Sequence, residues 1–275
     1  MSINIQSINT SEWRIDEFDK IVDEFEDSIS RALNNHTRTY SAYSNLVAYM
    51  AGKTIVTIRE ILTLATLGYP DGALSLARNI YEQFIILSFF ESHKYDSDFN
   101  DYLDDYITDY SIQRCKALKW YYRQFDDCAQ KVEEIEHDYR NAKDTANHNI
   151  SGDYWWTGHK CFSDVVNTII QSSDNKNKPF YCLLHIVYKR ACATLHASCF
   201  GNANRLGIDN NYNGIDTSPL EQGFGIPLWF ATSSFILIAG ISCNIFGVDF
   251  SDYKTKLNEL ALFYNNRRKE EMREA

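Results

Sequence analysis

The sequence predicts an all-α fold, and three observations support this prediction. Apolar residues recur at spacings of three and four through most of the 275 residues. No alternating run of apolar and polar residues is long enough to predict a strand. Short turns containing Gly or Pro separate the long periodic segments, which favours antiparallel helical hairpins. We therefore expect a single helical bundle of about eight to nine helices, forming one domain over residues 1–275.

The first three predicted helices follow from apolar stripes and turn residues. An amphipathic helix is expected over about residues 11–34, with one apolar stripe made of Trp13, Phe18, Ile21, Val22, Phe25, Ile29 and Leu33. A second helix over about 40–67 is ended by Gly68, and a third includes residues 72–90, with Asp71 as its expected N-cap. The short turn between the second and third helices predicts that they face each other.

The remaining helices are predicted from the same periodicity, at about residues 96–126, from there to about 145, at 161–171, 179–200 and 226–246, and from 252 onward. The helix over 96–126 is acidic and tyrosine-rich in its first half. Its second half is basic, with Arg114, Lys116, Lys119 and Arg123. A solvated face is the simplest interpretation. An acidic mimic of nucleic acid and a basic patch that contacts phosphate are the alternatives.

Composition limits the function classes. The formal charge of −10 disfavours general electrostatic attraction to nucleic acid or to anionic membrane, so any contact with nucleic acid must be local. The seven cysteines form no Cys-x-x-Cys motif, and their odd number fits reduced thiols. The first residues do not resemble a signal peptide. We therefore expect a cytoplasmic protein without disulfides.

Residues 226–246 are uncharged and long enough to span a bilayer. Polar Thr232, Ser233, Ser234, Ser242 and Asn244 interrupt this segment, and no Lys or Arg flanks it closely. We expect the central helix of a soluble core. A membrane-spanning helix is the alternative.

Arg78 and Glu82 lie one helical turn apart in an otherwise apolar helix. Burying an unpaired charge costs several kcal/mol or more, so these side chains must bind each other, other polar groups or a ligand. The pair is therefore either a structural clamp or the floor of an active site. Lys53, Arg59 and Glu60 on the preceding helix could lie near it, because that helix faces the third one.

The helix over 179–200 carries two further patterns. His185, Cys192 and His196 share one stripe, but the first and last are about 16 Å apart at about 1.5 Å per residue, so we predict no metal site and no cofactor. Arg190 and His196 match the Arg-x(4–6)-His spacing of the HEPN superfamily of helical ribonucleases. A metal-independent ribonuclease needs a group that titrates near neutral pH and a cation to hold the phosphate. A surface arginine and a half-buried histidine remain the alternative interpretation.

Three motifs together resemble the helical bacterial family called domain of unknown function 5677. They are Ala77-Arg78-Asn-Ile-Tyr-Glu82, Trp156-Thr-Gly158-His-Lys160 and Tyr188-x(3)-Cys192-x(3)-His196-Ala-Ser198. Their order and spacing match over about residues 40–240, between an N-terminal helix in 1–36 and a C-terminal helix in 250–275. Cys192 stands where that family tends to have Ser, and Ala197 where Pro is common. The resemblance implies the helical fold, the location of a site and a bacterial cytoplasmic setting, but no reaction.

The expected site comprises Arg78, Glu82, Arg190 and His196 as catalytic residues, with Lys53, Trp156 and Tyr188 as substrate-binding residues. Our leading hypothesis is a HEPN-like ribonuclease of toxin or phage-defence type. In it, His196 is the general base, Arg78 or Arg190 holds the phosphate, Glu82 orients an arginine and Trp156 stacks on a base. The partners would be RNA and either a second copy or another protein. A non-catalytic helical module that binds a protein or a small ligand is the rival hypothesis.

Overall fold

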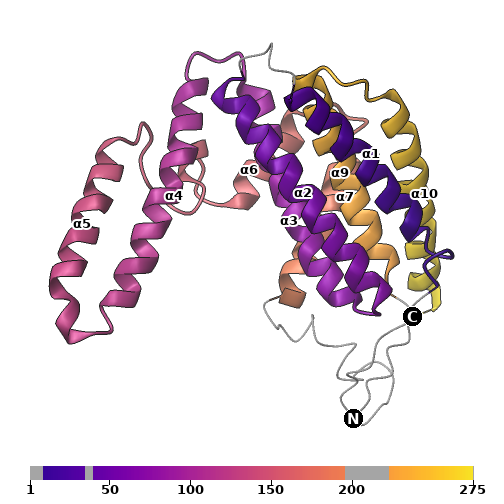
Figure 1. The fold of residues 1–275 in the computed structure, drawn as a ribbon, viewed down its shortest axis with the longest axis horizontal. Helices are drawn as coiled ribbons and strands as arrows, with labels where there is room; N and C mark the ends of the chain where they lie inside the picture. The colour runs from indigo at the N-terminus through magenta and orange to yellow at the C-terminus, as the bar shows by residue number, and fades with distance from the viewer. Residues whose placement is uncertain (1–8, 35–39, 196–222, 275) are drawn as a thin grey trace, which may run out of the picture. The chain divides into compact units, whose positions relative to one another are not determined.

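The structure is a computed structural model that describes residues 9–34, 40–195 and 223–274 (Figure 1). These residues form helices joined by turns, with no strand among them, which confirms the predicted all-α fold. The α-helices are α1 (Ile15–Leu33), α2 (Ala42–Thr66), α3 (Pro70–His93), α4 (Phe99–Tyr122), α5 (Ala129–Asp144), α6 (Phe162–Ser172), α7 (Lys178–Leu195), α9 (Gly225–Phe246) and α10 (Ser251–Glu274). Two short 3-10 helices, η1 (Asp126–Cys128) and η2 (Trp155–Thr157), lie between them.

Local sequence signals explain most of these boundaries. The Ser41 hydroxyl caps α2 by accepting a hydrogen bond from the Ser44 N–H at 3.1 Å. Gly247 ends α9 with a φ of +69°, a left-handed conformation that favours glycine. One detail of the prediction is wrong. Asp71 is not the N-cap of α3 but lies in its first turn, because Pro70 already occupies a helical position.

The chain divides into two compact units, and α3 contributes residues to both. The first unit comprises Met1–Leu87 and Asn175–Ala275, and the second comprises Ser88–Asp174. The single domain that we expect over residues 1–275 stays a prediction.

Helix α9 is the centre of the first unit and packs against α1, α2, α7 and α10. Phe18 and Phe25 from the apolar stripe of α1 contact Phe235 of α9, with ring centroids 6.3 and 5.2 Å apart. The predicted stripe of α1 is therefore the face that the unit buries. Removing a phenyl ring from such a position costs about 3–5 kcal/mol.

The first turn of α9 is built against the last turns of α10. Gly225 approaches α10 so closely that a Cβ atom at this position would lie 2.5 Å from the Arg268 nitrogen. The Glu271 carboxylate accepts hydrogen bonds from the N–H groups of Gly223, Phe224 and Gly225 at 2.7, 3.1 and 3.1 Å. One side chain of α10 thus satisfies three donors at the start of α9 that have no partner within the helix.

Helix α9 is long and apolar enough to cross a membrane by length and composition. In the structure, however, 72% of its most apolar 18-residue window is buried. Thr232 and Ser242 are buried and donate hydrogen bonds to the backbone carbonyls of Leu228 and Ile238. The helix therefore occupies the core position that its interrupted apolar pattern predicts.

The second unit contains the antiparallel hairpin of α4 and α5, which lie side by side in Figure 1. Its aromatic core lies around η2, where the buried Trp155 indole donates a hydrogen bond of 2.6 Å to Asp109 on α4. Contacts between η2 and α4 thus anchor the loop that follows α5.

Candidate functional site on helices α3 and α7

Arg78 and Glu82 form an ion pair along α3. The Arg78 Nε and Glu82 Oε1 atoms are 3.4 Å apart, and the two side chains are 18% and 24% exposed. The pair is therefore half-buried and still accessible from one side. This geometry agrees with the one-turn spacing in the sequence.

Helix α7 adds two polar groups to this pair. The Tyr188 hydroxyl donates a hydrogen bond of 3.0 Å to Glu82 Oε1. The Arg78 Nη1 atom lies 3.9 Å from the sulfur of Cys192, one turn further along α7. Tyr188, which we expect to bind substrate, thus lies directly beside the Arg78–Glu82 pair. We call Arg78, Glu82, Tyr188 and Cys192 the α3–α7 cluster.

Burial shifts the pKa of Tyr188 in this cluster and the pKa of the neighbouring His185. It raises the pKa of Tyr188 far above the ordinary value, and the Cys192 thiol and the negative charge of Glu82 raise it further. The hydroxyl therefore stays protonated and serves as a donor. The ring of His185 stacks on Tyr188 with centroids 5.6 Å apart. Burial, followed by the positive charge of Lys189, lowers the pKa of His185, so the neutral imidazole is favoured.

The guanidinium of Arg78 has unused hydrogen-bonding capacity. Arginine carries five N–H donors, whereas the contacts of Arg78 within the described ranges are the long ion pair with Glu82 and the weak one with Cys192. Its buried Nε makes no hydrogen bond of good geometry to the described residues. A half-buried arginine with free donors is suited to bind an oxyanion such as phosphate or carboxylate.

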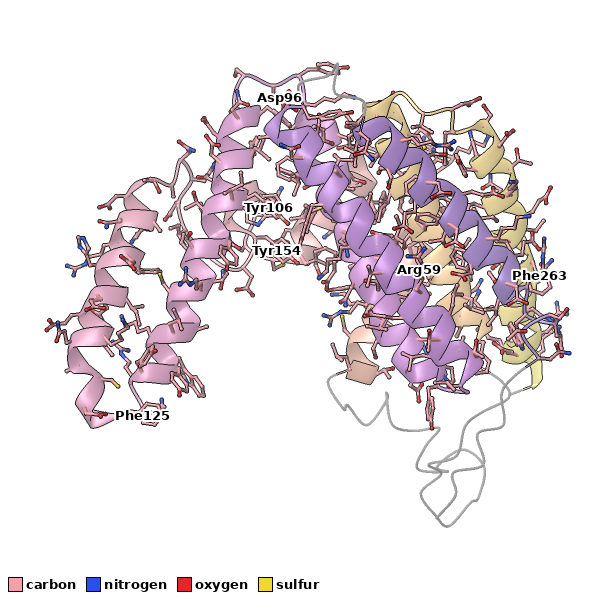
Figure 2. The ribbon with its side chains drawn as sticks, viewed as in Figure 1. Arg59, Asp96, Tyr106, Phe125, Tyr154 and Phe263 are labelled. Atoms are coloured by element: carbon pink, nitrogen blue, oxygen red, sulfur yellow. The ribbon has the colours of Figure 1, made fainter. Side chains whose placement is uncertain are left out.

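Two basic residues of α2 are Lys53, which belongs to the expected site, and Arg59. Lys53 is exposed on α2, next to Thr54, whose hydroxyl bonds Gln83 of α3 at 3.0 Å. Arg59, which could lie near Arg78 by the sequence, makes its ion pairs with another helix. It reaches from α2 to α1, where it pairs with two carboxylates, those of Asp23 and Glu26, at 2.6 Å each (Figure 2).

Trp156 belongs to the core of the second unit. It is 2% exposed, it stacks on Phe90 with centroids 5.5 Å apart, and Tyr106 and Tyr154, labelled in Figure 2, also contact it. A ring packed in this way offers almost no free face to a base. Its geometry therefore favours a packing role over the expected stacking role.

Two of the expected catalytic residues are on or beside α7. Arg190 is half-buried near the end of this helix. His196 follows Leu195, the last residue of α7, and lies outside the described residues. Within the described ranges, no group of three or more His, Cys, Asp or Glu side chains is arranged to hold a metal ion.

A second polar cluster, which the sequence reasoning did not single out, lies in the second unit. The carboxylate of Asp105 on α4 is fully buried. It accepts hydrogen bonds from the backbone N–H groups of Asn147 and His148 at 2.7 and 2.9 Å, and from the His148 Nδ1 at 2.7 Å. In the sequence, Asp105 lies in an acidic run for which a solvated face is the simplest interpretation, so no sequence signal indicated that its carboxylate is buried. These contacts tie the loop after α5 to α4.

Comparison with known proteins identifies a family. A protein-family model described as "Family of unknown function (DUF5677)" matches residues 44–214. This match confirms the resemblance that the three motifs predicted. No curated protein and no solved structure matches the chain.

Proposed function

The chain belongs to the family of unknown function DUF5677, and from its site we propose that it is a metal-independent endoribonuclease of HEPN-like kind, acting as a toxin or in phage defence. The observation that carries this proposal is the half-buried Arg78, whose guanidinium has donors that no described residue uses, beside Glu82 and Tyr188. An RNA phosphate is an anion that such a group would bind.

The α3–α7 cluster would act by holding the phosphate in place. Glu82 lies 3.4 Å from the Arg78 Nε along α3 and keeps the guanidinium close to it, and the Tyr188 hydroxyl holds Glu82 from the opposite helix. Arg78 would then stabilise the charge that builds up on the phosphate oxygens during the reaction. A cation already oriented before the substrate binds needs little reorganisation during the chemical step.

The proton transfers would fall to His196, with Arg190 as a second cation. His196 takes the proton of a 2′-hydroxyl, and the 2′-oxygen attacks the adjacent phosphorus. The bond from phosphorus to the 5′-oxygen breaks, and this oxygen takes a proton from water as it leaves, while His196 later releases the 2′-hydroxyl proton to solvent. The products are a 2′,3′-cyclic phosphate and a 5′-hydroxyl. Because the nucleophile is the 2′-oxygen of the substrate, this route needs no metal-bound water.

The first test compares RNA cleavage by purified wild type, His196→Ala, Arg78→Ala and Arg59→Ala. Arg59 is the matched control, because it lies on the neighbouring helix and pairs with α1 instead of the site. We expect wild type and Arg59→Ala to release fragments that end in 2′,3′-cyclic phosphate. Arg78→Ala should lower kcat/KM about 100-fold, and His196→Ala should abolish cleavage.

Induced expression in bacteria gives the matching cellular measurement. Growth arrest with fragmented RNA in wild type, absent from both site variants at equal soluble levels, would agree with the proposal. A His196→Ala protein that cleaves RNA as well as wild type would refute it.

One observation favours a non-catalytic alternative. Glu82 accepts contacts from Arg78 and from Tyr188, so the cluster also ties α3 to α7 as a clamp. In a binding module, Tyr188→Phe would lower the free energy of unfolding by about 1 kcal/mol. Wild type would then have no activity on RNA, and binding of a protein or a small ligand would be its only function.

A further inference from the structure

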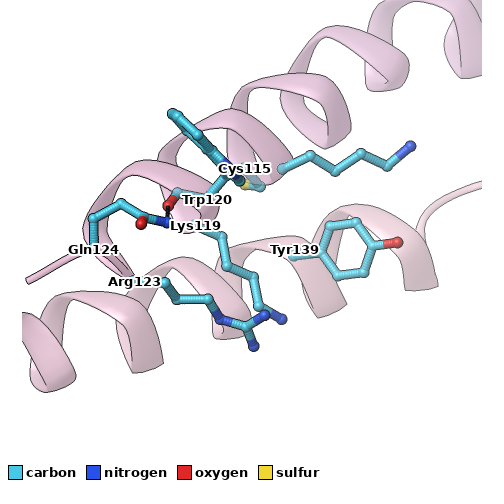
Figure 3. Close-up of a pocket in the computed structure, with 7 residues that line it drawn as sticks. Cys115, Lys119, Trp120, Arg123, Gln124 and Tyr139 are labelled. Atoms are coloured by element: carbon cyan, nitrogen blue, oxygen red, sulfur yellow. Dashed lines mark hydrogen bonds between the residues drawn. The ribbon is translucent and has the colours of Figure 1, made fainter.

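The hairpin of α4 and α5 carries a surface groove that the proposed chemistry does not use. It has a volume of about 350 Å³ and lies within the second unit. Lys116, Lys119 and Trp120 of α4 line it together with Arg123, which directly follows α4, and Tyr139 of α5. Figure 3 shows Lys119 and Arg123 extending from α4 toward the helix that carries Tyr139. The groove therefore combines cations with aromatic rings.

The charge of this groove differs from that of the chain. From Tyr110 to Gln124 the sequence has four basic residues and no acidic one, although the whole chain carries −10. Glu136 on α5 pairs with Lys119 and Arg123 at 2.6 and 3.1 Å and holds both side chains in place. Lys116 makes no ion pair with a described residue, so the three lining cations outnumber the one carboxylate that pairs with them, while Asp138 of α5 lies near Cys115 of the lining.

The indole of Trp120 is exposed at this groove. Trp120 is 69% exposed. The Gln124 side chain donates a hydrogen bond to the backbone carbonyl of Trp120 and not to its indole. An exposed indole beside three cations is an unusual surface for a protein in water. It is typical of sites where bases stack on a ring while the phosphates contact Lys and Arg.

We propose that this groove binds a single-stranded segment of RNA, with a base on Trp120 and the backbone phosphates on Lys116, Lys119 and Arg123. The choice of RNA over DNA rests on the proposed function. The stacking of a base and the phosphate contacts rest only on the residues of the groove. The site is a docking surface separate from the residues of the α3–α7 cluster. It would let an acidic protein bind a polyanion through a local patch.

The test measures binding of a fluorescent 2′-O-methyl RNA 12-mer to the full chain. This probe lacks free 2′-hydroxyls, so binding is measured whether or not the protein cleaves RNA. Trp120→Ala should weaken Kd about tenfold or more, and Lys116→Ala should weaken it several-fold. Tyr110→Ala and Lys131→Ala are matched controls with little expected effect. Tyr110 is an exposed ring on α4 outside the groove, and Lys131 is paired with Glu134 on α5.

The result of the binding test bears on the groove alone, and the result of the cleavage test bears on the proposed function. Binding that Trp120→Ala weakens supports the groove even when no RNA is cleaved. An unchanged Kd in Trp120→Ala, or no binding by wild type, overturns the groove even when cleavage is found. Equal competition by a polyglutamate peptide, or a wild-type dimer that Trp120→Ala converts to a monomer, would also overturn it, since the surface would then bind protein.

Discussion

At the scale of single residues, burial lowers the pKa of His185 beside the α3–α7 cluster and so favours its neutral form. Its Nδ1 is buried without a hydrogen bond to any described residue, and its ring stacks on Tyr188. Its pKa is lowered from the ordinary value of 6.5, first by burial and then by Lys189. The unfolded chain binds a proton near pH 6.5, whereas the folded chain does so only at lower pH. Folding stability is therefore fully present above that pH and is lost as the pH falls.

We predict that the free energy of unfolding decreases between pH 7.5 and 5.5, by at most about 1.4 kcal/mol per pH unit from this one group. His185→Phe should flatten this dependence, because it removes the titrating ring and keeps the aromatic contact. Urea unfolding at three pH values would measure it, with His137→Ala, an exposed histidine on α5, as the control. The same pH dependence in His185→Phe as in wild type would contradict the prediction.

The sequence was informative about residues whose partners are close along the chain. It predicted the Arg78–Glu82 pair, because helix geometry alone brings residues four apart together. It did not predict that Arg59 pairs with Asp23 and Glu26, because these carboxylates lie on another helix, 36 and 33 residues away along the chain. The packing of Trp156 on Phe90 could not be predicted either, because the two residues are far apart in the sequence.

At the scale of helices, the close contact of α9 and α10 depends on a residue without a side chain. A Cβ at Gly225 would lie 2.5 Å from the nitrogen and 2.7 Å from the Cα of Arg268. Backbone atoms cannot move aside as the end of a flexible side chain can. Apolar periodicity predicted where both helices lie, but it contains no information about how closely two helices approach.

We predict that Gly225→Ala destabilises the fold by about 1–3 kcal/mol, because α9 and α10 must separate. Gly52→Ala on α2 is the matched control, since a Cβ there meets no atom within 4 Å. Alanine in that helix should stabilise the protein by about 0.5–1 kcal/mol. Denaturant unfolding would compare the two, and stabilisation by both substitutions would be the contrary result.

At the scale of the whole molecule, the helices are grouped in two compact units. The sequence predicted the all-α class and the position of most helices, because periodicity and turn residues are local signals. The division at Leu87 and Ser88 was not visible, because α3 continues through it without a break in its apolar pattern. Contacts between distant segments define a compact unit, and a single sequence does not reveal them.

The buried Asp105 provides a test of how independent the second unit is. Asp105→Ala removes the acceptor for two backbone N–H groups and for His148, which should cost about 3 kcal/mol. We expect hydrogen exchange to accelerate mainly within Ser88–Asp174, because the lost contacts all lie in that unit. Asp104→Ala, an exposed neighbour, should leave exchange unchanged. Equal acceleration in both units would instead indicate one cooperative domain.

The three hydrogen bonds from the start of α9 to Glu271 affect how the protein can be shortened. The family match ends at residue 214, so boundaries chosen from it would remove α9 together with the carboxylate that caps it. Even a deletion from residue 271 onward would leave three N–H donors of the central helix without their acceptor. Terminal residues usually tolerate removal, but here the last helical turn completes the core, so a shorter protein is best designed to keep it.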